Sequence, residues 1–366
     1  MIIAGFTIYA YQIPLVRALT MKGLKTVDRE GLFIRLTDDN DRHGWGEISP
    51  LPGFSSEQSN DIIEQSQKLK YHLTGTTLPD HLEELSGGFD RWLRPLDLSA
   101  SVRFGIEMAV LNLLASSRNG MLVELLGDTS ARTITINALL SGTNDQVTIK
   151  AAEYLKAGYG TFKLKVGRKN LDADIALTRR VRQIIGDRTV LRLDANRAWR
   201  LDEAVSFAAG TKNCAIDYIE EPLVDSQALA DFHERTGILF ALDESLRESK
   251  PEKIVIPDGA AALILKPTLL GGFETTMRYA RRAQRDNLKA VVSSSFETPA
   301  GLHALTHLAA ALNDSDTAHG LGTAGRLGDD ISDIPFRVAD GAVEIAPLKP
   351  FHFPLKPTYL RELSND

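Results

Sequence analysis

Residues 161–166 read TFKLKV, a short β-rich segment in which lysines alternate with apolar side chains. Successive side chains of a strand point to opposite faces, so Lys163 and Lys165 share one face and the apolar residues share the other. If the apolar face packs on helices, both lysines point inward, where burial and like charge favour the neutral amine, a proton acceptor. The alternative is an exposed edge strand with a solvated lysine face.

Similar β-rich segments recur every ~22 to 28 residues from about residue 133 onward, separated by longer amphipathic stretches. The eight segments are ITINALL (134–140), TFKLKV (161–166), VLRLDAN (190–196), IDYIEEP (216–222), LFALDE (239–244), ALILKP (262–267), AVVSSSF (290–296) and AHGLGT (318–323). This alternation indicates an α/β fold, either a closed (β/α) TIM barrel or a doubly wound open sheet. We predict a (β/α) barrel catalytic domain over residues 131–330.

The chain before the barrel has a different pattern, which predicts an α+β domain over residues 1–130. Its expected antiparallel strands are FTIYAYQIPL (6–15), GLFIRLTD (31–38) and HGWGEISPL (43–51), and its expected helices span 55–73 and 99–117. The hairpin-like segment 333–347 is expected to pair back onto this domain, so that residues 331–366 complete it. The polar loops 17–31 and 48–57 either cover a site on the barrel or are plain surface loops.

Acidic side chains follow three successive barrel segments at their carboxyl ends, where barrel enzymes place their reactive groups. Alternation turns Asp194 and Asp243 inward, while Glu220 and Glu221 cannot be told apart by periodicity. Three carboxylates at one point repel one another unless a cation lies between them. Oxygen ligands without histidine or cysteine favour Mg²⁺, with Mn²⁺ as a substitute, over zinc.

Further polar residues follow the later segments. Lys266 ends the sixth segment, across the barrel from the second, so a substrate on the metal would have a lysine on either side. Ser293, Ser294 and Ser295 end the seventh, where they bind a polar substituent or form a plain loop. His303 and His307 are spaced like metal ligands on a helix, but the helix is apolar and lacks a neighbouring carboxylate, which favours packing.

Composition limits the classes of partner. The formal charge is −6 and the basic residues are scattered, which argues against nucleic acid. The amino terminus resembles a strand more than a secretory signal, and no apolar run is long enough for a membrane span, so we expect a cytoplasmic protein. The single cysteine, Cys214, excludes an internal disulfide and a thiolate metal cluster.

The order of these motifs resembles the enolase superfamily. The matching motifs are Lys163-Leu-Lys165, Asp194-Ala-Asn196, Glu220-Glu221-Pro222, Asp243-Glu244-Ser245 and Lys266-Pro267. The resemblance covers nearly the whole chain and implies a (β/α) barrel of enolase type with an α+β capping domain whose loops close the barrel mouth. It also implies that the first acid of the fourth motif is a metal ligand, which selects Glu220 beside Asp194 and Asp243.

Within the superfamily, residues 44–55, 191–199 and 293–297 together resemble the o-succinylbenzoate synthase family of menaquinone biosynthesis. That resemblance implies a lyase that dehydrates 2-succinyl-6-hydroxy-2,4-cyclohexadiene-1-carboxylate, a small carboxylate. Lys165 would remove the α proton and then assist departure of the hydroxyl, while Mg²⁺ stabilises the enediolate. Lys163 would keep Lys165 basic and Lys266 would stabilise the intermediate. The expected substrate-binding residues are Arg192, Asn196, Ser293, Ser294 and Ser295.

Other reactions fit the same motifs. An N-acylamino acid racemase, or another racemase or cycloisomerase of the superfamily, would use Lys165 and Lys266 as opposed bases. A dipeptide epimerase is disfavoured, because His319–Thr323 lacks the Asp-x-Asp of that class. Two rivals from other classes are a Schiff-base lyase that needs no metal and a non-catalytic metal-binding barrel. The chain is expected to be a monomer or a homo-oligomer.

Overall fold

A computed structural model describes residues 1–21, 24–127, 131–312, 316–329, 331–332, 335–345 and 356–363. The first part of the chain forms an antiparallel sheet of order β13-β1-β2-β3. Its strands are β1 (Ile3–Met21), β2 (Leu24–Asp38), β3 (His43–Ile48) and β13 (Leu360–Glu362). The helices beside it are α1 (Ser59–Leu73), α2 (Gly88–Leu93), α3 (Ala100–Ser117) and α4 (Leu122–Leu126). The predicted antiparallel strands and both predicted helices are confirmed, and α2 and α4 were not predicted.

Two glycines bring the sheet against α3, which is buried on nearly all sides. A Cβ atom added at Gly44 would lie 2.1 Å from the carbonyl oxygen of Ala109, and one at Gly46 would lie 1.9 Å from that of Gly105. No side chain fits at either position, because the backbones of β3 and α3 are in direct contact. The GWGE sequence of β3 is therefore a packing motif as well as a strand.

The second part of the chain forms a parallel sheet of order β11-β10-β9-β8-β7-β6-β5. Its strands are β5 (Ala138–Leu140), β6 (Thr161–Lys165), β7 (Val190–Asp194), β8 (Ile216–Glu220), β9 (Phe240–Leu242), β10 (Ala260–Leu265) and β11 (Lys289–Val292). The eighth predicted segment joins the two edges: His319 bridges to Ile136 and Gly320 to Ser293, both in parallel. The sheet is thus closed, which confirms the barrel and excludes the open doubly wound sheet.

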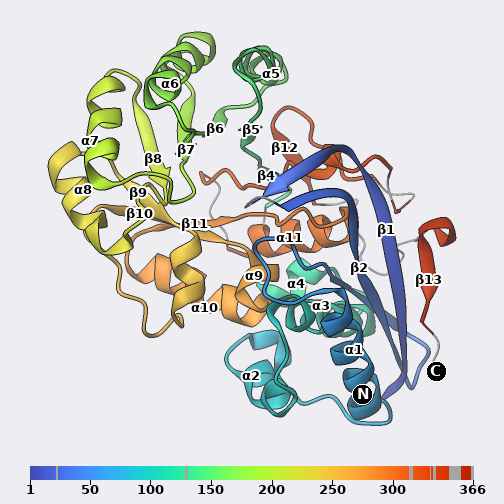
Figure 1. The fold of residues 1–366 in the computed structure, drawn as a ribbon. Coiled ribbons are helices and arrows are strands. Elements are labelled where there is room, and N and C mark those ends of the chain that lie inside the picture. Colours follow the sequence, from blue (N-terminus) through green and yellow to red (C-terminus); the bar gives the residue numbers. More distant parts are fainter. Residues whose placement is uncertain are drawn as a thin grey trace.

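Helices surround this barrel on its outside (Figure 1). They are α5 (Asn144–Lys156), α6 (Leu171–Ile185), α7 (Leu201–Gly210), α8 (Leu229–Thr236), α9 (Pro267–Leu270), α10 (Phe273–Arg285) and α11 (Pro299–Ala311). Short 3-10 helices span Leu82–Glu84, Arg94–Leu96, Ser226–Ala228, Glu244–Glu248, Ala324–Arg326 and Pro357–Tyr359. The outward-facing residues of β6, β7 and β8 share one apolar core with α5, α6, α7, α8 and α10, as the alternation in TFKLKV predicts. Helix α11 packs instead in the cluster of the amino-terminal domain.

The carboxyl-terminal hairpin departs from the prediction. β12 (Ala342–Glu344) pairs antiparallel with β4 (Thr133–Thr135), which directly precedes the barrel, instead of with the amino-terminal sheet. The reason is that Val343 and Ile345 are buried in the same apolar cluster as Ile134. The later strand β13 does pair with β1. We propose the domain limits 1–130 and 131–330 on this pattern.

The long hairpin of β1 and β2 curves from the amino-terminal domain toward the barrel (Figure 1).

Among the described residues no helix is both long and apolar enough to cross a membrane.

Candidate active site

A cavity of about 450 Å³ lies at the carboxyl ends of the barrel strands. Lysines, acids and serines of the barrel line it, together with Leu19, Leu51 and Phe54 of the amino-terminal domain. Leu19 comes from the β1–β2 hairpin, and the other two from the loop after β3. The segment 17–31, expected to be a loop, instead contains the end of β1 and the start of β2. Of the two alternatives for 17–31 and 48–57, the structure favours the first, because both segments border the cavity.

The two lysines of β6 point into the barrel, as predicted. Lys163 is 8% exposed, and its Nζ lies 2.8 Å from Asp194 Oδ2 and also bonds Glu220. Lys165 Nζ lies 2.6 Å from Asp194 Oδ2 and donates to Asn196 Oδ1 at 2.7 Å. The strand register places Lys165 beside Asp194, and Asp194 beside Glu220. A solvated lysine face is therefore excluded.

The acids change the charge expected on Lys163 and raise the pKa of Lys266 as well. Burial lowers the pKa of Lys163, but the carboxylates of Asp194 and Glu220 outweigh it and hold this pKa well above its ordinary value. Burial likewise lowers the pKa of Lys266, and Asp243 brings it above the ordinary value. The expectation of a neutral amine is wrong for Lys163 in this arrangement, because it weighed desolvation and like charge but not the facing acids.

The carboxylates respond to the same neighbours. Burial raises the pKa of Asp194, but Lys163 and Lys165 lower it to well below its ordinary range. Burial raises the pKa of Glu220 to about 7. Lys163 acts to lower this pKa, whereas Asp194 and Asp243 act to raise it. Three buried acids thus lie within electrostatic reach of one another and balance their charge against lysines.

The structure separates the two acids that periodicity could not. Glu220 lies inside the barrel against Lys163, whereas Glu221 points away from the cavity. Glu221 Oε1 accepts from the backbone N–H groups of Asp243 at 2.9 Å and of Ser245 at 2.8 Å, and Arg197 Nε donates to its Oε2 at 3.0 Å. Glu221 therefore fixes the loop that carries Asp243.

Lys266 lies across the barrel from Lys165, because three strands separate β10 from β6 in the sheet order. Its Nζ bonds Asp243, and both lysines line the cavity. A molecule in this cavity would have an amine from each side, as predicted.

Sequence reasoning missed Glu244, which lines the cavity and is 7% exposed. Asn196 Nδ2 donates to Glu244 Oε1 at 3.1 Å. The other carboxylate oxygen of Glu244, Oε2, has no hydrogen-bond partner within the described part of the chain. Burial, and then Asp243, raise the pKa of this carboxyl. Strand alternation would turn Glu244 outward, but β9 ends at Leu242 and a 3-10 helix begins at Glu244. The feature of the sequence that could have pointed to Glu244 is its position directly after Asp243.

The predicted metal ligands form an oxygen-only set of three buried carboxylates, with Asp194, Glu220 and Asp243 between 1% and 5% exposed. Within the ranges that the structure describes, no three His, Cys, Asp or Glu side chains lie close enough together to hold a metal ion in their present positions. Each of the three instead bonds a lysine. The chemistry of the set fits a hard divalent cation, whose binding would replace lysine contacts by metal contacts.

The predicted substrate-binding residues lie in two places. Asn196 and all three serines line the cavity. Ser294 Oγ is 2.7 Å from Thr323 Oγ1, whereas the buried Ser295 Oγ has no hydrogen-bond partner among residues the structure describes. The Ser295 hydroxyl is thus enclosed by protein and, of the three, has the least contact with the cavity.

Arg192 is not among the residues that line the cavity. It points inward as alternation predicts, but its Nε donates to Asp217 at 3.2 Å and its Nη1 to the carbonyl oxygen of Ala318 at 2.7 Å. Its guanidinium also lies 5.0 Å from the ring centroid of Tyr218. We therefore remove Arg192 from the proposed substrate-binding residues.

His303 and His307 are buried in α11, and His307 Nδ1 accepts from the backbone N–H of Val123 at 3.2 Å. Cys214 is buried as well. These placements agree with packing roles.

Comparisons with known proteins agree with this architecture. Residues 3–113 match the family model "MenC, N-terminal domain", and residues 146–350 match "Enolase C-terminal domain-like". The o-succinylbenzoate synthase of Klebsiella pneumoniae (strain 342) is 34% identical over 320 residues, which are 86% of this chain and 89% of that protein.

A plant relative is much longer. Protein PHYLLO, chloroplastic, of Arabidopsis thaliana is 32% identical over 338 residues, which are 83% of this chain and 20% of that protein. The chain thus spans about a fifth of the length of this relative.

Among solved structures, the dipeptide epimerase of Enterococcus faecalis V583 complexed with Mg and the dipeptide L-Leu-L-Tyr has a TM-score of 0.83. It is 20% identical in sequence, and the alignment covers 94% of this chain and 97% of that one. This likeness concerns the fold. On the family models and the curated relatives, the chain belongs to the enolase superfamily and, within it, to the MenC or o-succinylbenzoate synthase family.

Proposed function

We propose that this protein is an o-succinylbenzoate synthase, which dehydrates 2-succinyl-6-hydroxy-2,4-cyclohexadiene-1-carboxylate to o-succinylbenzoate. The observation that carries the proposal is the placement of Lys165 and Lys266 on opposite sides of one cavity, beside three buried carboxylates. This arrangement suits removal of a proton next to a carboxylate group. Membership of the MenC family supports the particular substrate.

The chain's own residues supply the proton transfers. Lys165 Nζ, oriented by Asn196 Oδ1 and Asp194 Oδ2, would take the proton from the carbon next to the ring carboxylate. The same Nζ would then return that proton to the departing hydroxyl, so that water leaves and the ring becomes aromatic. Lys266 would balance negative charge from the opposite face, and the hydroxyl groups of Ser293 and Ser294 would contact a polar substituent of the substrate.

The proposed metal ligands are Asp194, Glu220 and Asp243, with Mg²⁺ as the expected ion. When bound, it would neutralise the carboxylates that now hold the lysines and withdraw negative charge from the substrate carboxylate. Glu221 would keep Asp243 in place through its backbone and side-chain bonds.

A direct assay tests the proposal. Purified protein with Mg²⁺ is expected to convert the cyclohexadiene substrate to o-succinylbenzoate, and EDTA is expected to abolish turnover until Mg²⁺ is restored. No product with Mg²⁺ present would reject the proposed substrate. Turnover that persists in EDTA would favour the Schiff-base lyase.

One observation also favours a second candidate, racemisation of an N-acylamino acid. Lys165 and Lys266 face the same cavity from opposite strands, as two opposed bases require. Incubation of each enantiomer in deuterated solvent would show α-proton exchange if this reaction occurs. Absence of exchange with both enantiomers would remove this candidate.

A further inference from the structure

Arg29 joins separate segments of the chain around the cavity. It lies on β2, is 2% exposed, and its guanidinium donates to backbone carbonyl oxygens. Nε donates to Phe296 at 2.8 Å, Nη2 to Ser49 at 2.6 Å, and Nη1 to Pro50 at 2.6 Å and Glu30 at 3.1 Å. One capping-domain side chain thus binds the loop after β3 and the loop after β11.

Both bonded loops carry residues of the main cavity. Phe296 follows Ser295 directly, and Pro50 directly precedes Leu51, which lines the cavity as do the serines. The planar guanidinium has five N–H donors in a fixed geometry, so it sets the distance between the two backbones. A shift of Arg29 would therefore move both walls.

A second capping-domain side chain holds the same barrel loop a few residues later. Glu47 is fully buried and accepts from the backbone N–H and hydroxyl of Thr298, at 2.9 and 2.8 Å, and from Gly301 N–H at 3.0 Å. These groups lie at the start of α11, so Glu47 satisfies free N–H groups of that helix. Tyr11 donates its hydroxyl to Glu47 at 2.8 Å.

Glu297 connects this junction with the rest of the site. Its Oε2 accepts from the backbone N–H of Ser295 at 2.7 Å, and its Oε1 accepts from Thr268 Oγ1 at 2.6 Å. Thr268 lies two residues after Lys266 in the chain. The loops of Ser295 and Lys266 are therefore linked to each other as well as to the capping domain.

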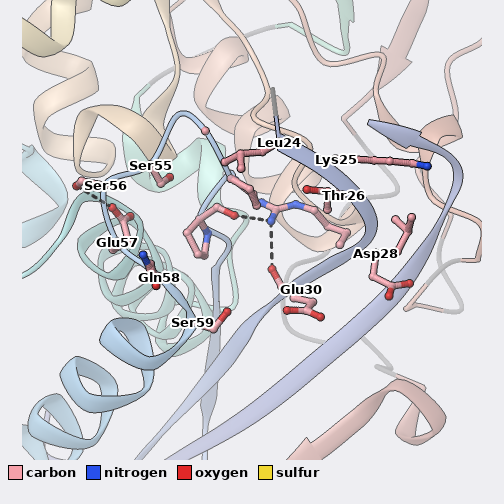
Figure 2. Close-up of a pocket in the computed structure, with 15 residues that line it drawn as sticks. Leu24, Lys25, Thr26, Asp28, Glu30, Ser55, Ser56, Glu57, Gln58 and Ser59 are labelled. Atoms are coloured by element: carbon pink, nitrogen blue, oxygen red, sulfur yellow. Dashed lines mark hydrogen bonds between the residues drawn. The ribbon is translucent and has the colours of Figure 1, made fainter. Parts of the chain in front are cut away.

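The loop after β3 is buried where it begins, at Ser49, Pro50 and Leu51, and partly exposed from Pro52 onward. A second cavity, of about 570 Å³, lies beside this loop. Figure 2 shows Ser55, Ser56 and Glu57 on one side of it and Thr26 and Asp28 of β2 on the other. Arg29 and Pro50 also line this cavity. The outer part of the loop gains few packing contacts beside this hollow, so its order depends on the buried start of the loop, where Ser49 and Pro50 bond Arg29.

We propose that Arg29 is a positioning residue, which locks the loop of Ser293–Phe296 to the loop of Ser49–Phe54 and thereby fixes the serines that line the cavity. Ser293 and Ser294 line the cavity and are each 7% exposed, so the position of their loop decides how a substrate is held. The contribution to substrate binding rests on the proposed synthase function, while the locking of the loops does not.

The test compares Arg29→Met and Arg29→Lys with the wild type, all with Mg²⁺. Amide hydrogen exchange is measured at 49–54 and 293–296, and kcat and KM are measured with the cyclohexadiene substrate. Arg29→Met is expected to speed exchange in both segments by about tenfold and to raise KM by about tenfold, with kcat within about threefold. The exchange rates and KM of Arg29→Lys are expected to lie between those of the wild type and of Arg29→Met, since an ammonium group cannot bridge both loops in the same way.

Arg42→Met is the matched control. Arg42 belongs to the same domain, pairs with Asp38 at 2.6 Å and donates to the carbonyl oxygen of Ser117, away from both loops. Its loss is expected to leave exchange at 49–54 and 293–296 and KM unchanged. If Arg29→Met does not fold, Arg29→Lys carries the comparison.

Two results would overturn the proposal: unchanged exchange in both segments of a folded Arg29 variant, or a fall in kcat with KM unchanged. If the wild type does not turn over the substrate, the synthase function fails, and exchange alone then decides whether Arg29 locks the loops.

Discussion

Asp194 and Lys163 illustrate how single residues of this site depend on one another. Each carboxylate proposed as a metal ligand bonds a lysine, and each buried lysine bonds an acid. Burial alone would neutralise these groups, yet the pKa of Lys163 is raised and that of Asp194 is lowered. Removing one partner would therefore leave an uncompensated charge, so substitutions here act through the neighbours as well.

Asp243→Asn is expected to weaken Mg²⁺ binding first, because it removes one of three ligand charges. The loss of affinity should exceed the 10- to 100-fold that is typical of changes outside the ligand set. Isothermal titration with Mg²⁺ measures it. Unchanged affinity would remove Asp243 from the ligand set.

Glu221→Gln tests whether Glu221 holds the proposed metal ligand Asp243 in place. Glu221 accepts two backbone N–H groups at the end of β9 and is paired with Arg197. The neutral amide keeps the size but weakens these charged bonds, so Mg²⁺ affinity should fall by about 10- to 100-fold with the fold intact. The same titration, with circular dichroism as the control for folding, decides this. An affinity equal to the wild type would mean that Glu221 does not hold Asp243.

At the scale of elements, close contact between β3 and α3 joins sheet and helix in the amino-terminal domain. A Cβ atom at Gly46 would meet the backbone of α3 at 1.9 Å. Gly46→Ala is therefore expected to lower the free energy of unfolding by about 3 kcal/mol, near the upper end for overpacked sites. Urea unfolding measures this value. Gly160→Ala is the control, because a Cβ atom there meets nothing within 4 Å, and an equal loss in both variants would contradict the packing argument.

Much of the barrel could be predicted from the sequence, because strand alternation and polar strand ends are local patterns. TFKLKV places Lys163 and Lys165 correctly, and the acids follow at the ends of the next strands. Alternation gives the face of a residue but not its depth. Arg192 lies on the same face as Asp194 but two residues earlier, about 6.6 Å deeper, where Asp217 engages it.

Other features depend on where an element ends or on contacts distant in sequence. Glu244 faces the cavity because β9 stops at Leu242, and a periodicity argument cannot locate that stop. β12 pairs with β4 because Val343 and Ile134 share one apolar cluster, although about two hundred residues separate them in the chain. Arg29 likewise reads as an ordinary strand residue until the fold brings Phe296 to it.

At the scale of the molecule, the site is shared between a barrel and a capping domain. The barrel supplies the lysines and acids, whereas Leu19, Leu51 and Phe54 of the amino-terminal domain close the cavity. The reactive groups are thus held by the strands, and the shape around the substrate is set by loops. Changes in the capping loops should therefore alter substrate choice more than the proton transfer.

Lys165 is the residue that we propose for that proton transfer. The decisive measurement is turnover of the cyclohexadiene substrate by Lys165→Ala, at a Mg²⁺ concentration that saturates both proteins. We expect kcat to fall by about 10⁴-fold while Mg²⁺ affinity and the unfolding transition stay close to those of the wild type. A Lys165→Ala enzyme that retains activity within about tenfold of the wild type would contradict this assignment.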